Sequence, residues 1–75
     1  MNTTYKRLRD LQPADRIKLC DPEGVAEITH VEPCTWVRFD NGPGRIAHYR
    51  IVDGPETGET GRCLDGADCE IEVVA

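Results

Sequence analysis

Residues 35–51 read TWVRFD-NGPG-RIAHYRI, and this stretch decides the fold. Two runs rich in aromatic and β-branched residues flank a break formed by Asn41, Gly42, Pro43 and Gly44. Such runs favour a pleated, half-buried surface. Asn and Gly tolerate the positive φ angles that a tight chain reversal requires, and Pro presets its own φ angle for a turn. The pattern therefore predicts a β-hairpin.

Two registers are compatible with this hairpin. Pairing Phe39 with Ala47 turns five side chains toward the core: Val37, Phe39, Ala47, Tyr49 and Ile51. The same pairing turns four side chains outward: Trp36, Arg38, His48 and Arg50. Pairing Phe39 with Ile46 instead turns Ile46 and His48 inward and leaves Trp36 and Tyr49 outside. A slip of one residue exchanges the faces of one whole strand. We prefer the first register because it keeps His48 and Arg50 out of the core.

The segment before the hairpin predicts two further strands. Residues 16–20 alternate apolar and polar side chains, and residues 21–24 (DPEG) form a strong turn signal. A long strand is expected over residues 25–32, ended by Pro33 and Cys34. Neither face of that strand is cleanly apolar along its whole length, so its inward face must change midway. Such a strand usually bends or carries a bulge.

The sequence predicts the structure of the two chain ends less directly. Thr3 and Thr4 are candidate N-caps, and Tyr5, Leu8 and Leu11 are spaced by three, which predicts a helical turn closing before Pro13. A strand is the second choice for this region.

Residues 53–61 form an acidic loop, because Gly, Pro and acidic residues dominate them. Residues 62–75 are interpreted as a C-terminal hairpin whose turn lies within residues 64–68. In its closing strand Ile71 and Val73 face inward, and Glu70 and Glu72 face outward.

Seventy-five residues allow a single domain, residues 1–75, which buries only about 60% of its extended-chain surface. Five or six short antiparallel strands with frequent turn signals predict a mostly-β fold, a small barrel or an orthogonal sandwich. The order of parts resembles SH3-like barrels of the KOW and Tudor kind, which often open with Leu-x-Pro-Gly-Asp-x-Ile/Val. Here that entry is residues 11–17, LQPADRI, with Ala14 where Gly is usual. The resemblance covers residues 11–52 as a barrel core and leaves the C-terminal hairpin as an addition.

The formal net charge is −5 and is unevenly distributed. Residues 1–19 carry +3, residues 20–52 carry −2 and residues 53–75 carry −6. Affinity for nucleic acid depends on clustered Lys and Arg, so the acidic half argues against general binding to phosphate backbones. It suits a basic protein partner, or only solubility.

No motif in the chain indicates catalysis or a cofactor. The four cysteines, Cys20, Cys34, Cys63 and Cys69, are separated by 14, 29 and 6 positions and contain no Cys-x-x-Cys knuckle, so no metal site is predicted. Cys63 and Cys69 face one another in the expected hairpin, where a disulfide is an alternative to reduced thiols. No signal-peptide core and no apolar run of about 18 residues is found, so we expect a cytoplasmic protein without a membrane segment.

Two surfaces are candidates for binding. The first is an aromatic and basic strip formed by Trp36, Arg38, His48 and Arg50, which His30 extends, because Trp and Arg anchor many interfaces. The alternative is that Trp36 covers an open edge of the barrel and that the arginines pair with nearby acids. The second surface is the acidic segment that includes Glu70 and Glu72, whose alternative is a solvated outer face.

The sequence therefore predicts a non-catalytic protein-binding module. A small acidic regulator or inhibitor of a protein complex, for instance one encoded by a bacterium or its phage, fits its size and charge. The alternative function is a nucleic-acid-binding SH3-like domain that uses the basic N-terminal segment and the Trp36 face. The oligomeric state is left open.

Overall fold

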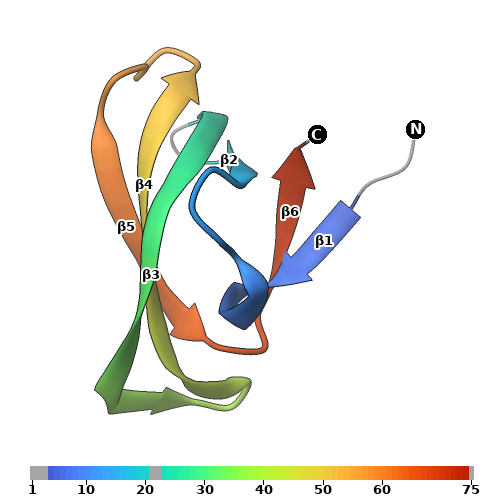
Figure 1. Ribbon diagram of the computed structural model, residues 1–75, viewed down its shortest axis with the longest axis vertical. Helices are drawn as coiled ribbons and strands as arrows, with labels where there is room; N and C mark the ends of the chain where they lie inside the picture. The colour runs from blue at the N-terminus through green and yellow to red at the C-terminus, as the bar shows by residue number, and fades with distance from the viewer. Residues whose placement is uncertain (1–3, 21–22, 75) are drawn as a thin grey trace.

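The structure, a computed structural model, describes residues 4–20 and 23–74, most of which lie in strands. In chain order the elements are β1 (Thr4–Arg7), the 3-10 helix η1 (Leu8–Asp10), β2 (Arg16–Cys20), β3 (Glu23–Phe39), β4 (Gly42–Asp53), β5 (Thr60–Gly66) and β6 (Glu70–Val74). The six strands form one antiparallel sheet in the order β1-β6-β2-β3-β4-β5 (Figure 1). The predicted mostly-β fold of five or six antiparallel strands is thus confirmed. The sheet is not closed, so β1 and β5 are its edges.

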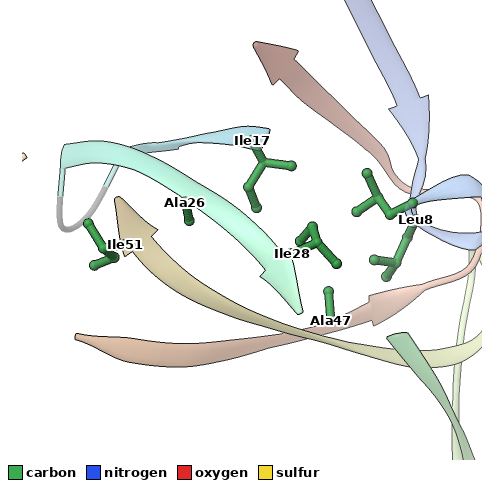
Figure 2. Packing of buried hydrophobic residues seen from close by; sticks show 7 residues of the cluster. Leu8, Ile17, Ala26, Ile28, Ala47 and Ile51 are labelled. Carbon is green, nitrogen blue, oxygen red and sulfur yellow. The ribbon is translucent and has the colours of Figure 1, made fainter. Parts of the chain in front are cut away.

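The sheet bends so that its two ends face one another across the core. Strands β3, β4 and β5 form one long curved wall, and β6 and β1 lie opposite it with η1 at one end of the space between them (Figure 1). Seven buried side chains fill this space: Leu8, Leu11, Ile17, Ala26, Ile28, Ala47 and Ile51. Figure 2 shows Leu8 of η1 pointing toward Ile28 and Ala47 of the wall. The helical turn therefore supplies the side chain that seals one end of the core.

Strand β3 does not end at Pro33, as the sequence suggested. It runs for 17 residues, and Pro33 lies within it, opposite Arg45 of β4. Strand β2 pairs with only the first five residues of β3, Glu23–Glu27. Among the described residues, the other side of β3 therefore has no strand neighbour at Pro33. Proline is tolerated at such an edge because it has no N–H to leave unpaired. The expected strand end was wrong for this reason.

The bulge expected midway along β3 is confirmed at Thr29. Ile28 pairs with Tyr49, but His30 pairs with His48, so Thr29 and His30 together oppose one residue of β4. The Thr29 hydroxyl donates a hydrogen bond of 3.1 Å to the carbonyl oxygen of His48. One extra residue reverses the inward and outward positions that follow it. Consequently Ile28 faces the core before the bulge and Val31 packs against the core after it.

The predicted hairpin is present, but neither predicted register is correct. Phe39 pairs with Gly42 across a two-residue turn at Asp40 and Asn41. Ala47 instead pairs with Val31, and Ile46 pairs with Glu32.

A further register shift, between Cys34 and Arg38, leaves residues 35–37 without partners on β4. The inward face of β4 still follows the preferred register, because Ala47 and Ile51 are buried and Arg50 is exposed. Val37 and Phe39, expected inside, are only half-buried and lie outside the core cluster.

Both chain ends differ in part from expectation. Residues 4–7 form β1, the second choice, and the helical turn begins only at Leu8. Thr3 and the first two residues of the 21–24 turn lie outside the described residues. The acidic loop spans residues 54–59, close to its predicted bounds.

The expected C-terminal hairpin is wrong in its pairing, because β5 pairs with β4 whereas β6 pairs with β1 and β2. The segment between β5 and β6 is hydrogen-bonded to the turn region of the β3–β4 hairpin. The Ala67 N–H donates to Pro43 O and the Asp68 N–H donates to Asn41 O. The chain therefore crosses from one half of the sheet to the other.

Ala14 is the one residue other than Gly with a positive φ angle, 76°, in the described part of the chain. This left-handed conformation costs a residue with a Cβ about 1–2 kcal/mol, which glycine avoids. We expect Ala14→Gly to raise the free energy of unfolding by about 0.5–1 kcal/mol, since the greater chain entropy of Gly offsets part of the gain. Chemical denaturation measures the change. Ala26→Gly, at a buried strand position, is the matched control and should be destabilising; an Ala14→Gly protein less stable than wild type would contradict this interpretation.

The Asp15 carboxylate accepts a 2.9 Å hydrogen bond from the Gln12 N–H and lies 3.1 Å from Lys6 Nζ. The Gln12 N–H, assisted by Lys6, lowers the Asp15 pKa below 3.8, against the opposing effect of burial. A carboxyl whose pKa is lower in the folded state stabilises the protein above its unfolded pKa, and this contribution disappears as the pH falls through the folded value. Asp15→Asn should therefore cost about 1 kcal/mol at pH 7.

Denaturation of both proteins as a function of pH tests this expectation, and the difference should shrink below pH about 4. Asp10→Asn, which changes an exposed carboxylate of η1, is the control and should have little effect. A difference between wild type and Asp15→Asn that stays constant down to pH about 2 would contradict the assignment.

Candidate functional site

The outer face of β3, β4 and β5 carries most of the predicted aromatic and basic strip. Pairing places side chains in two rows across these strands: His30, His48 and Arg62 in one, and Glu32, Ile46 and Leu64 in the next. The alternation of β4 directs Ile46, His48 and Arg50 away from the core, because Ala47, Tyr49 and Ile51 face it. The bulge at Thr29 brings His30 and Glu32 of β3 to the same outer face.

Trp36 owes its exposure to the register shift between Cys34 and Arg38 of β3. It lies in the middle of residues 35–37, which have no partners on β4, and its side chain is 77% exposed. The backbone at this point passes close over Gly44: a Cβ there would lie 2.8 Å from Val37 O and 2.9 Å from Cys34 O. The second glycine of the NGPG break is therefore needed for the bulge to seat on β4.

A small depression lies beside Trp36. It has a volume of about 230 Å³ and is lined by Trp36, Ile46, Arg62 and Leu64, which we call the Trp36 face. Leu64 is 40% exposed, so two large apolar side chains of this face are open to solvent. Arg62 supplies a cation at its edge. The combination of a rigid aromatic ring, aliphatic walls and one arginine is typical of an interface anchor.

Glu32 forms a close cluster with His30 and His48 of the neighbouring row. The two imidazole rings stack with their centroids 4.1 Å apart and their planes 10° from parallel. Glu32 Oε2 lies 3.3 Å from His30 Nε2 and 3.2 Å from His48 Nε2. The His48 nitrogen and Glu32 are not aligned for a hydrogen bond, so Nε2 of His48 is buried without a hydrogen-bond partner among the described residues.

The predicted site residues divide into three groups. Trp36, His48 and Arg50 lie on the outer face of the wall, and His48 and Trp36 border two depressions that share Arg62. Arg38 is exposed opposite Pro43, beyond the bulge, and lines neither depression. Glu70 and Glu72 lie on β6, in the other half of the sheet.

The sequence did not indicate a binding role for four residues of the outer face, which are Glu32, Ile46, Arg62 and Leu64. The sequence turned Ile46 inward in one of the two registers, Glu32 falls in a strand without a cleanly apolar face, and Leu64 falls within the expected turn. Arg62 enters the sequence prediction only through the net charge of residues 53–75. Alternation along β4 and β5 would have grouped Ile46 with Leu64, but only the observed pairing of the two strands puts them side by side.

Ion pairs within the molecule engage most of the basic residues in positions 1–19. Lys6 contacts Asp15, Arg7 and Arg9 both contact Asp68, and Arg16 lies 3.8 Å from Glu27. Four of the five basic residues in positions 1–19 therefore have carboxylate neighbours. Such exposed pairs stabilise little, but they reduce the positive field available to a nucleic-acid phosphate. Glu70, one of the acidic residues of β6, is the register partner of Arg7 in β1.

All four cysteines are free thiols. Burial raises the pKa of Cys63, and the neighbouring Asp65 adds to that effect. Burial, together with a hydrogen bond and the charge of Asp65, raises the pKa of Cys69 to about 11. Because the thiolate is both the nucleophile and the metal ligand, these two side chains behave at neutral pH as small apolar groups packed against the core.

Comparisons with protein-family models, with curated proteins and with solved structures find no match to this chain. The resemblance to SH3-like barrels accordingly stays a prediction. The 3-10 turn η1, the one helical segment among residues 4–20 and 23–74, is too short to cross a bilayer.

Exposure and pKa predict an order of thiol reactivity. Cys20 is exposed, Cys34 is 2% exposed, and Cys63 and Cys69 have raised pKa values. A single equivalent of iodoacetamide at neutral pH should therefore modify Cys20 first, as located by peptide mass spectrometry. In unfolding concentrations of urea the preference should vanish, because burial then no longer separates the thiols. Preferential labelling of Cys69 in the folded protein would contradict the assignment.

Proposed function

We propose that this protein is a non-catalytic module that binds another protein through the Trp36 face. The single observation that carries the proposal is the 77% exposure of Trp36 beside the partly exposed Leu64. An indole ring left in water loses the favourable free energy of apolar burial, which a partner restores by covering it. Interface energy concentrates on such aromatic anchors, and arginine is the other residue type enriched there.

The shape and charge of the face favour a particular partner chemistry. A depression of about 230 Å³ is smaller than the roughly 300–1,000 Å³ of pockets that enclose small molecules, but it suits an inserted side chain. Arg62 at its edge, with Arg50 on the same outer face, favours a carboxylate nearby. The partner we propose therefore presents an apolar side chain flanked by Asp or Glu.

The location of the face at a sheet edge supports binding of an extended segment. Strand β5 pairs only with β4, so the backbone groups along its other side have no strand partner in the described sheet. A partner segment that adds to β5 would place alternate side chains beside Leu64 and Arg62. Backbone hydrogen bonds would then add affinity, and the depression would select the side chain.

We propose an SH3-like architecture for the module. Its support is the order of short strand β2, long bent β3 and hairpin, together with the left-handed φ angle of Ala14 at the position where glycine is usual. We propose that the module acts as a small regulator or inhibitor of a bacterial or phage protein complex. This role is supported by the small size and net charge of −5.

The experiment compares Trp36→Ala with Tyr5→Ala, which removes a 55% exposed aromatic ring from β1, the opposite edge strand. Peptides are selected from a random displayed library on the wild-type protein, and affinities are then measured for all three proteins. We expect enriched peptides to combine an apolar residue with Asp or Glu. Trp36→Ala should weaken them at least tenfold, as is usual for an aromatic anchor worth about 1.4–2 kcal/mol or more, and Tyr5→Ala should not.

Two outcomes would overturn the proposal. One is a set of peptides that bind Trp36→Ala as well as wild type, in which case the Trp36 face is not the contact. The other comes from mixed-sequence RNA and DNA at about 50 mM salt, where we expect no binding. Micromolar binding that weakens steeply with salt would favour the nucleic-acid alternative instead.

A further inference from the structure

We propose that His30, Glu32 and His48 form a binding site for a divalent transition-metal ion of the zinc class. The three side chains offer two imidazole nitrogens and one carboxylate oxygen, all within 4.8 Å of one another. They come from two directly paired strands, β3 and β4, whose backbones fix their spacing. This site is separate from the proposed protein contact and does not depend on it.

The spacing of the donor atoms fits a tetrahedral ion. Bonds of about 2.0–2.1 Å from Zn²⁺ to nitrogen and oxygen place neighbouring ligand atoms about 3.3–3.4 Å apart in a tetrahedron. Glu32 Oε2 lies 3.3 Å from His30 Nε2 and 3.2 Å from His48 Nε2. Two of the three ligand separations therefore already match those around a bound ion.

The donor nitrogens of the two imidazoles lie within 4.8 Å of one another, and the rings must rotate to direct both at one ion. Imidazole lone pairs lie in the ring plane, and two rings stacked 10° from parallel direct them side by side rather than to one point. The His30 side chain is 56% exposed and has room to turn about its side-chain bonds. His48 Nε2, buried without a hydrogen-bond partner, would gain one strong ligand bond in exchange.

The donor set determines the class of ion. Calcium and magnesium prefer oxygen ligands, whereas two imidazoles with one carboxylate suit Zn²⁺, Ni²⁺, Cu²⁺ or Co²⁺. Three protein ligands leave a fourth position for water or for a group from a binding partner. Arg62 of β5 pairs with His48 of β4, and its positive charge repels a bound cation. The negative charge of the Glu32 carboxylate offsets this repulsion. The net charge of −5 also favours cation binding.

The test uses the full chain, freed of metal and titrated with zinc chloride. The chain contains only two histidines, both in the cluster, so the nitrogen resonances of the imidazole rings report on this site alone. We expect both sets of ring resonances to shift to a common saturation point at one equivalent. Calorimetry should give the same stoichiometry, and cobalt should bind without thiolate-to-metal absorption.

Glu32→Gln and His30→Gln change exposed side chains and should leave the fold intact, as amide exchange or circular dichroism verifies. Each should weaken zinc binding at least tenfold. Cys20→Ser, which removes the exposed thiol, is the matched control and should bind as wild type does. Imidazole resonances that do not move at saturating zinc, or a Glu32→Gln protein with unchanged affinity, would overturn the proposal.

Discussion

The bulge at Thr29 is the constraint on which the outer surface of this protein depends. Before it, Ala26 and Ile28 face the core; after it, Val31 takes over the inward position. A strand without the extra residue would direct His30 and Glu32 into the aliphatic core, where burial of an imidazole and a carboxylate is costly. The bulge allows one long strand to present apolar side chains to the core along its length. It also places His30 opposite His48 and brings Glu32 within 3.2 Å of His48. Fold and candidate metal site therefore share one cause.

The register shift between Cys34 and Arg38 of β3 has a comparable effect on the Trp36 face. Three residues without partners lift Trp36 out of the alternating pattern, and Gly44 leaves space for the crossing backbone. The ring then lies beside side chains of β4 and β5, far along the chain from it. The acidic residues of β6 lie in the other half of the sheet, so the Trp36 face and the acidic face are separate surfaces. A partner selected by one face need not contact the other.

Sequence patterns predicted the strands better than they predicted the pairing. The strand at Arg16–Cys20, the loop after β4 and the change of face along β3 all follow from local alternation and turn chemistry. The register across NGPG does not, because it depends on three unpaired residues at 35–37 that no local preference reveals. The strand end predicted at Pro33 was wrong for a similar reason. A proline ends a strand only where the missing N–H would have donated a hydrogen bond in the sheet. The separation of β5 from β6 is set by hydrogen bonds from their connecting corner to the hairpin tip.

By itself the sequence determined a mostly-β fold, favoured a strand that turns Ala47 and Ile51 inward and Arg50 outward, and showed no recognised catalytic motif. These conclusions rest on alternation and composition, which act over a few neighbouring residues. Only the tertiary structure decided that His30, Glu32 and His48 meet, and that Trp36 lies beside Ile46 and Leu64. Contacts between strands are fixed by bulges and by the competition of all strands for one core, and that information is distributed over the whole chain.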